Sequence, residues 1–249
     1  MISQLDTKII GRKLYHFDTI DSTNIFAKIL IKKGAEEGTV VVADAQSSGY
    51  GRKDRTWSSP KGGLWFSVVL YPVISPKSGM IVTMATSVAI AKGIEEITGI
   101  IPLIKWPNDL LINGKKVCGV LTELDVRKDI INNVVVGIGI NVNNQIDEEL
   151  NKIAVSLVDE VGTEISIDEL LSSILINLDE TYNRLIHNDY DFIRDSWLSY
   201  SSILGKKIQV QDDETVTIGK VIDVDDDGCL ILDTENGSVK VICGDITYL

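Results

Sequence analysis

Apolar residues in the first third of the chain fall into short runs with the composition of β-strands. The runs cover residues 13–20, 39–45 and 64–71 and are rich in β-branched or aromatic residues. The second and third, TVVVADA and LWFSVVLY, are nearly continuous in apolar character, which is typical of strands buried on both faces. We therefore expect three strands here, two of them in the interior.

Residues 24–33, between the first two of these runs, have the apolar spacing of a helix. Asp21 or Ser22 can cap the start of this helix, and Gly34 can end it. The predicted apolar stripe consists of Ile25, Phe26, Ile29 and Leu30.

Residues 78–98 predict a second helix, long and largely buried, that ends at Gly99. A short strand over 103–106 follows it and is stopped by Pro107, which cannot donate a backbone hydrogen bond. These two elements continue the mixture of helix and strand along the chain.

Two apolar runs within residues 109–124 flank Asn113 and Gly114, and Asn-Gly between such runs is the strongest short signal for a β-hairpin. Residues 134–143 predict a further strand that contains two glycines. The asparagine-rich segment after this strand predicts a loop.

The last third changes from helical to strand-like patterning. Residues 167–200 have helical spacing, and after Gly205 short β-rich runs alternate with polar turns, which predicts a small all-β unit such as a compact barrel. We expect two domains, residues 1–201 and 202–249. The order of elements favours an α+β fold with a mixed sheet and helices on one face, rather than a doubly wound fold.

Composition narrows the range of functions. The 249 residues include 24 Lys and Arg against 36 Asp and Glu, a formal net charge of -12, which disfavours nucleic acid as a partner. The three cysteines form no CxxC pair and the two histidines have no ligand partner, so a zinc site is not expected. The sequence shows no signal peptide and no apolar run of membrane-spanning length. We therefore expect a cytoplasmic protein with no membrane contact.

Against this acidic background, the loop SGYGRKDRTWSSPKGG, residues 48–63, is basic and glycine-rich. Glycines let a backbone approach a ligand closely, and arginine offers a planar fork of donors for carboxylate and phosphate oxygens. One interpretation is a flap that closes over a small anionic molecule, with Trp57 and Trp65 as flat apolar surfaces. The other is a solvated loop whose cations balance the acidic surface.

A second candidate site is KWPNDLLINGKKVCGV, residues 105–120. Asn108 and Asp109 follow a strand directly, and the tight turn brings Lys115 and Lys116 back alongside them. Carboxylate, amide and ammonium groups in this arrangement are suited to a metal ion and a polyphosphate. A plain hairpin with exposed lysines is an equally acceptable interpretation.

Two shorter motifs have structural explanations as well as functional ones. In IDSTN, residues 20–24, the polar residues are either helix caps or hydrogen-bonding partners of a polar ligand head. In GIGINVN, residues 137–143, the glycines are typical of a strand that another segment crosses closely.

Taken in order, these motifs resemble the biotin protein ligases, also called biotin–[acetyl-CoA-carboxylase] ligases. The matching stretches are IDSTN, ADAQSSGYGRKDRTW, GGLWFSVVL, KWPNDLLINGKKVCGVLTE and GIGINVN, followed by the small β unit. The resemblance implies a catalytic domain like those of class II synthetases, with a C-terminal SH3-like β-barrel. It also implies a homodimer.

The resemblance implies a two-step reaction with ATP and biotin as substrates and Mg²⁺ as the assisting ion. The carboxylate of biotin attacks the α-phosphate of ATP to give biotinyl-5′-AMP and pyrophosphate. A lysine of a biotin carboxyl carrier protein or domain then attacks this mixed anhydride. A basic loop suits this chemistry, because cations cancel the repulsion between a carboxylate and a triphosphate, and closure excludes water.

Site residues follow from the resemblance position by position, with Arg52 and Lys116 as the catalytic pair. The positions implied around biotin are Ser22, Thr23, Asn24, Gln46, Tyr50, Gly51, Arg52, Trp57, Lys116 and Gly119. Those implied around ATP are Arg52, Arg55, Trp57, Asn108, Lys116 and Asn141, with Asp109 as the metal ligand.

Tyr50 departs from the family pattern, because it stands where the usual loop, GRGRxxR, has its first arginine. Either the backbone N–H at this position serves the ligand or the Tyr50 hydroxyl does. Some members of the family carry an N-terminal helix-turn-helix domain and repress transcription. IDSTN begins by residue 20, so we expect a ligase without that domain.

Two other functions compete with this one. A lipoate- or octanoate-protein ligase shares the catalytic fold, but KWPND favours biotin. A non-catalytic regulator that binds biotin or a nucleotide is the other alternative, and it would not need Arg52, Arg55 and Lys116 directed at phosphate.

Overall fold

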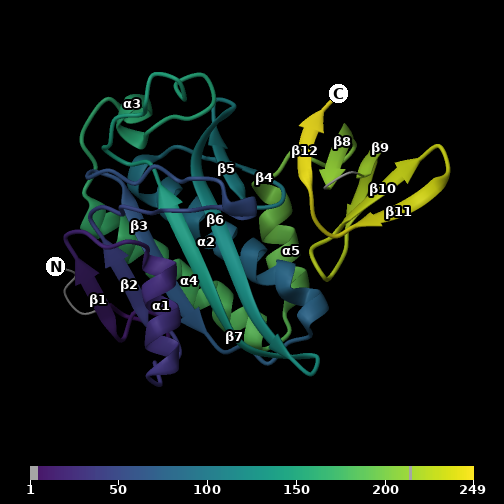
Figure 1. Cartoon of the computed structure of the whole chain (residues 1–249). Helices are drawn as coiled ribbons and strands as arrows, with labels where there is room; N and C mark the ends of the chain where they lie inside the picture. The colour runs from purple at the N-terminus through teal and green to yellow at the C-terminus, as the bar shows by residue number, and fades with distance from the viewer. Residues whose placement is uncertain (1–4, 213–214) are drawn as a thin grey trace.

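The computed structural model of the chain, which describes residues 5–212 and 215–249, contains two β-sheets, with helices packed on the first (Figure 1). In the first sheet β1 and β2 are parallel and every other neighbouring pair is antiparallel, which confirms the predicted mixed sheet. In spatial order its strands are β1 (Leu14–Phe17), β2 (Val40–Ala43), β3 (Leu64–Leu70), β7 (Ile130–Ile140), β6 (Lys115–Arg127), β5 (Asp109–Ile112) and β4 (Leu103–Lys105).

Helices cover both faces of this sheet. Three of them, α2 (Gly79–Thr98), α4 (Ile167–Ile186) and α5 (Tyr190–Ser199), pack together on one face and bury most of the core there. The first helix, α1 (Thr23–Lys32), packs on the other face, in front of the sheet in Figure 1. The predicted layer of helices on one face is therefore present, with one further helix opposite it.

Side chains alternate in direction along each strand, which explains why helices can cover both faces of the sheet. In β2, Val40 and Val42 belong to the core beneath α2 and α4, whereas Val41 packs toward α1. Successive side chains of a strand point to opposite faces, so a run without polar residues is buried on both. This is the arrangement that the continuous apolar runs predicted.

The predicted apolar stripe of α1 is partly wrong. Ile25 and Ile29 are 44% and 40% exposed, while the helix turns Thr23, Asn24 and Ala27 toward the sheet, with Leu30 also buried. Two polar side chains thus occupy positions that apolar spacing alone would assign to solvent. Their inward orientation is explained by the hydrogen bonds described below.

The end of α2 and the turn of the central hairpin follow the sequence signals. Gly99 adopts a left-handed conformation, φ 72°, and its N–H donates to the Glu95 carbonyl at 2.8 Å. Asn113 and Gly114 have φ values of 50° and 77°, as a tight hairpin turn requires. The hairpin therefore directs β6 back along β5, as predicted.

Short helical segments interrupt the loops. They are η1 (Arg52–Asp54) in the basic loop, η2 (Pro76–Ser78) before α2, and α3 (Leu157–Val161) after the asparagine-rich loop. The sequence pattern did not indicate α3, which has only five residues. Lys53 in η1 has φ 54°, so the basic loop turns sharply at this point.

The second sheet is the predicted C-terminal β unit, five antiparallel strands beside the α5 and β4 end of the first sheet (Figure 1). It is attached through Trp106, whose indole N–H donates to the Gly228 carbonyl at 3.1 Å, and through Ser78, whose hydroxyl donates to Asp227 at 2.7 Å. In spatial order its strands are β11 (Gly237–Val241), β10 (Leu230–Thr234), β9 (Thr215–Val224), β8 (Lys207–Asp212) and β12 (Asp245–Tyr248).

Candidate active site

A cavity of about 400 Å³ lies where the basic loop, the start of α1, the centre of β6 and β7, and the loop after β7 meet. Every site residue that the family resemblance implied lines this cavity, although these residues span more than a hundred positions of the chain. The lining residues from that set are Ser22, Thr23, Asn24, Gln46, Tyr50, Gly51, Arg52, Arg55, Trp57, Asn108, Asp109, Lys116, Gly119 and Asn141. The expectation of Trp65 as a flat surface for a ligand is wrong, because its ring is fully buried and its N–H donates to the Pro60 carbonyl at 2.9 Å. Lys115 does not line the cavity either.

One end of the cavity, which we call the neutral end, is formed by uncharged polar groups at the start of α1. Ser22, Thr23 and Asn24 are at most 5% exposed. Ser22 is the N-cap residue, yet its side chain makes no capping hydrogen bond. Instead, Gln46 Oε1 accepts from both the N–H and the hydroxyl of Thr23, at 2.8 and 3.1 Å. Gln46, which lies just before the basic loop, thus helps to hold the start of α1 in place.

Asn24 is fixed from three sides. Its Nδ2 donates to Glu123 Oε2 at 2.8 Å, and its Oδ1 accepts from the Ser67 hydroxyl at 2.5 Å. A Cβ atom at Gly137 would collide with the Asn24 amide, so only glycine leaves room for it on β7. This explains one of the two glycines that the sequence pattern associated with a close crossing.

The indole of Trp57 lies over the middle of the sheet. Gly119 and Gly139 are directly paired across β6 and β7, and a side chain at either position would meet the Trp57 ring. The Lys116 ammonium lies 4.9 Å from the ring centre, within cation–π range. The ring is therefore held between two strands and one cation.

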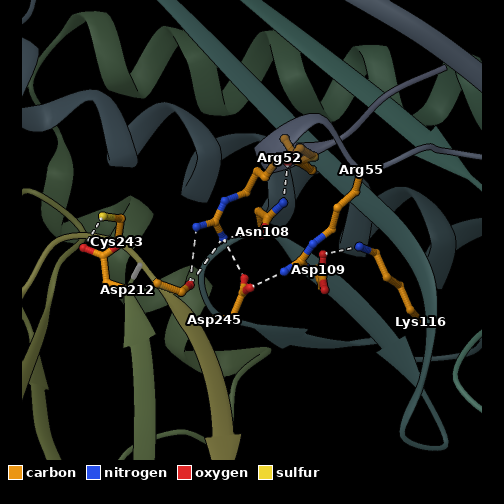
Figure 2. Close-up of polar contacts among 10 residues, drawn as sticks. Arg52, Arg55, Asn108, Asp109, Lys116, Asp212, Cys243 and Asp245 are labelled. Carbon is orange, nitrogen blue, oxygen red and sulfur yellow. Dashed lines mark hydrogen bonds and ion pairs between the residues drawn. The ribbon is translucent and has the colours of Figure 1, made fainter. Parts of the chain in front are cut away.

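The other end of the cavity, which we call the charged end, joins the basic loop to the C-terminal sheet (Figure 2). Arg55 and the Asp245 carboxylate are 2.6 Å apart, and Arg52 lies 3.8 Å from the same carboxylate. Arg52 also donates to Asn108 Oδ1 at 3.2 Å and to the Gly244 carbonyl at 3.4 Å. The loop cations thus converge on one carboxylate from β12.

These cations also affect proton affinity at Asp245. Burial raises the pKa of its carboxyl, but the hydrogen bond and charge of Arg55, together with the charge of Arg52, lower that pKa below its ordinary value overall. Asp245 is therefore ionised at neutral pH and forms ion pairs with the guanidinium groups of Arg52 and Arg55.

The central hairpin supplies the second charged pair. Lys116 Nζ lies 2.6 Å from Asp109 Oδ1, so the turn brings these side chains together as the sequence predicted (Figure 2). The backbone N–H of Lys116 donates to Ile153 in the loop after β7, and its carbonyl accepts from Val155. That loop also carries Asn141, whose Oδ1 accepts from Asn144 Nδ2 at 3.1 Å.

Four residues of this region were missed by sequence reasoning. A signal existed for Ser67, a polar residue within an otherwise apolar strand run, and for Glu123, a charged residue within a mostly apolar one. Gly137 was noticed only as a strand glycine. Asp245 had no local signal, because its partners lie almost two hundred positions earlier in the chain.

The part of the chain that the structure describes contains neither a metal-binding cluster nor a helix that could span a membrane. Residues 5–212 and 215–249 contain no group of three or more His, Cys, Asp or Glu side chains placed to hold a metal ion. Among the same residues, no helix is both long enough and apolar enough to cross a membrane.

Comparisons with known proteins give the same picture from two regions of the chain. Residues 16–141 match the model of the biotin/lipoate A/B protein ligase family, and residues 203–247 match the biotin protein ligase C terminal domain. The chain is 38% identical to the bifunctional ligase/repressor BirA of Bacillus subtilis over 246 residues, covering 97% of this chain and 76% of that protein.

Other relatives have ligase names, and solved structures are similar to the chain as well. The chain is 30% identical to the biotin–[acetyl-CoA-carboxylase] ligase of Paracoccus denitrificans, over 85% of this chain and 90% of that protein. It also superimposes on the biotin protein ligase from Aquifex aeolicus in complex with biotin and ATP, with a TM-score of 0.80 and 30% identity. That superposition covers 96% of this chain and 99% of the other.

Proposed function

The chain belongs to the biotin/lipoate A/B protein ligase family, and from that premise we propose that its cavity performs both steps of protein biotinylation. The protein is an ATP-dependent ligase that activates biotin as biotinyl-5′-AMP and transfers it to a lysine of a biotin carboxyl carrier domain. The observation that carries this function is a single cavity with a neutral end for a polar ring and a charged end for phosphates.

In the first step, the neutral end orients the ring of biotin and directs its carboxylate toward the charged end. Thr23, Asn24 and Gln46 bind the polar head, with Ser22 beside them. Gly119 lets the ring lie against the backbone once the Trp57 indole moves off this position. Arg52 and Lys116 then neutralise the carboxylate and the α-phosphate as the new bond forms. The remaining biotin contacts are assigned to Tyr50, Gly51 and Trp57.

ATP occupies the charged end in this proposal. Arg55 and Asn108 bind the phosphate side, and Asn141 lies toward the nucleoside, while Trp57 packs on the bound nucleotide. In the structure Arg52 and Arg55 are paired with Asp245, so the triphosphate must replace that carboxylate as their partner. Binding of the nucleotide is thus coupled to rearrangement of the basic loop.

Magnesium belongs to the same proposal, with Asp109 as its protein ligand. Mg²⁺ in enzymes that use nucleotides is commonly held by one or two carboxylates together with substrate phosphates. Asp109 lines the cavity and is partly exposed, which fits that mode, although it must first separate from Lys116. The ion would neutralise charge on the triphosphate.

The second step needs the anhydride to survive until the acceptor lysine arrives. Water attacks acyl phosphates readily, so a loop that covers the intermediate has a direct use. We infer that the basic loop closes over biotinyl-5′-AMP and leaves the mixed anhydride accessible to the carrier domain. The amine then attacks the acyl carbon, and AMP leaves with the electron pair of the broken bond.

Three further features belong to this proposal. We infer a catalytic domain over residues 1–201 and a separate β domain over 202–249, supported by the two sheets with different topology. We infer a homodimer from the family resemblance. We infer a cytoplasmic location, supported by three cysteines that are all free.

ATP–pyrophosphate exchange tests the function directly. Exchange should depend on biotin and should be far weaker with lipoate or octanoate. Adding a purified biotin carboxyl carrier domain should give a product with one biotin on one lysine, detected by mass. Exchange that is equal with all three acids, or that needs no acid, would remove the proposed substrate.

A further inference from the structure

A continuous chain of hydrogen bonds runs beneath the neutral end of the cavity. It starts at Glu123, which accepts from Asn24 Nδ2 at 2.8 Å. The Ser67 hydroxyl oxygen lies 2.5 Å from Asn24 Oδ1 and 2.7 Å from the Thr23 hydroxyl oxygen. The Thr23 hydroxyl in turn lies 3.1 Å from Gln46 Oε1. Five side chains from four separate segments therefore form one connected unit.

The charge of Glu123 fixes the direction of this chain. Its Oε1 pairs with Lys28 at 2.6 Å, and its Oε2 also accepts from the Tyr50 hydroxyl at 2.9 Å. Burial raises the pKa of Glu123, but the hydrogen bonds from Lys28, Asn24 and Tyr50 lower it below its ordinary value. An ionised carboxylate can only accept, so Asn24 must present its Nδ2 to Glu123 and its Oδ1 to Ser67.

With this direction, the hydrogen-bond chain is one proton short. The chain has an acceptor at each end, Asn24 Oδ1 and Gln46 Oε1, and the orientation of Gln46 is set by the Thr23 backbone N–H at 2.8 Å. Between these ends are three oxygen–oxygen contacts, and the hydroxyls of Ser67 and Thr23 supply only two protons. One contact therefore lacks a donor, in a region where unpaired polar atoms are unfavourable.

We propose that Glu123 is a positioning and specificity-determining residue. Its charge fixes the orientation of Asn24, so the hydrogen-bond chain at the neutral end lacks one donor. A ligand with ring N–H groups supplies that donor. The inference rests on the proposed function, because the cyclic urea of biotin supplies such N–H groups. Thr23 and Gln46 line the cavity, so a ligand donor can reach the deficient part of the chain. The hydrocarbon chains of octanoate and lipoate have no N–H and leave the deficiency in place.

The substitution Glu123→Gln tests this directly, because it corrects the deficiency without a ligand. The oxygen of the new amide can still accept from Lys28, while the amide nitrogen can donate to an inverted Asn24 amide and to Tyr50. The inverted Asn24 then donates to Ser67, and each of the three contacts acquires a proton. The variant should fold normally, yet a ligand N–H would no longer supply a missing proton, so the ligand should gain less from binding there.

The experiment measures biotin-dependent ATP–pyrophosphate exchange and octanoate inhibition for wild type and Glu123→Gln. The KM for biotin should rise roughly 10- to 100-fold, the range for one buried hydrogen-bonding group left unpaired. The kcat should stay within about threefold of wild type, because the charged end is intact. The inhibition constant for octanoate should not change. The ligand-free unfolding midpoint should stay within about 4 °C of wild type.

Two variants complete the test. Glu96→Gln is the matched control, since Glu96 likewise accepts from an asparagine, Asn177 at 3.0 Å, and from a hydroxyl, that of Ser173 at 2.5 Å, away from the cavity. Glu123→Asp keeps an acceptor-only group and should retain a lower biotin KM than Glu123→Gln. An unchanged biotin KM in Glu123→Gln overturns the inference, as does equal weakening of biotin and octanoate. Wild-type protein without biotin-dependent exchange would instead refute the proposed function.

Discussion

The two ends of the cavity are held in place by different forces. The neutral end consists of buried hydroxyl and amide groups that bond to one another across α1, β3 and the loop at Gln46. The charged end consists of partly exposed cations paired with carboxylates, Arg55 with Asp245 and Lys116 with Asp109. In the proposed function, the first is arranged for its ligand before binding, whereas the second exchanges its partners during the reaction. Substitutions at the neutral end should therefore alter ligand binding, and those at the charged end should alter the chemical step.

The largest expected effect is at Lys116, and it would break the charged end while sparing the neutral one. Lys116→Ala should reduce the rate of adenylate formation about 10²–10³-fold, as for loss of one preorganised electrostatic donor. Biotin binding without ATP should change much less, because Thr23, Asn24 and Gln46, which are assigned to the polar head of biotin, lie on other segments. Biotin titration and ATP–pyrophosphate exchange measure the two effects separately.

Lys115→Ala is the control for this prediction, since Lys115 is the adjacent residue of β6 and does not line the cavity. Its exchange rate should stay near that of wild type. Wild-type exchange by Lys116→Ala would show that the phosphates bind elsewhere.

Gly137→Ala should produce the next largest effect, at the neutral end. The added methyl group would displace the Asn24 amide, and overpacking of this kind costs about 1–3 kcal/mol in the free energy of unfolding. The biotin KM should rise and the unfolding midpoint should fall, while kcat at saturating biotin is largely retained. Gly51→Ala is the control for unfolding, because the nearest atom to its new Cβ is the Arg55 carbonyl oxygen at 3.7 Å. Unfolding midpoints that match in the two variants would contradict this expectation.

Tyr50→Phe sharpens the comparison, because Tyr50 belongs to the loop but bonds to the neutral end through Glu123. Loss of this hydroxyl should weaken biotin binding by about 0.5–1.5 kcal/mol, since Lys28 and Asn24 still hold the carboxylate. Biotin titration of both proteins measures the difference. A loss well above tenfold would mean that the hydroxyl contacts biotin itself.

The smallest effect is expected at Asp245, and its direction is opposite to the others. Asp245→Asn removes the carboxylate that competes with the triphosphate, so the KM for ATP should fall by about two- to fivefold, the scale of an exposed ion pair. Steady-state exchange at varied ATP checks this. Asp223→Asn, which breaks the 2.7 Å pair with Arg194 away from the cavity, should leave this KM unchanged. A raised KM in Asp245→Asn would show that the carboxylate positions the arginines for ATP.

Local patterns predicted most of the fold. The Asn113-Gly114 turn and the end of α2 at Gly99 were correct because each depends on a backbone conformation that few residues adopt. The stripe of α1 was wrong at Ile25 and Ile29 because hydrogen bonds to Gln46 and Glu123 rotate the helix start inward. Such a rotation depends on residues from other segments, which apolar spacing does not contain.

In the candidate site, too, local sequence predicted some features, whereas others depend on residues from distant segments. Motifs and the family resemblance named residues that line one cavity, whereas Glu123 and Asp245 became visible only through their partners. The roles of all these residues in catalysis and binding are still predictions. Sequence motifs identify the groups that face a ligand more readily than the groups that orient them.

The position of Trp57 allows ligand binding in the cavity to be followed by tryptophan fluorescence. Trp65, Trp106 and Trp197 are at most 1% exposed and lie in the core, away from any change in solvent. Trp57 alone among the four tryptophans lines the cavity, over two glycines and beneath an ammonium group. Entry of a ligand must change the surroundings of that indole, so the intrinsic emission of the unlabelled protein can follow occupancy of the site in real time.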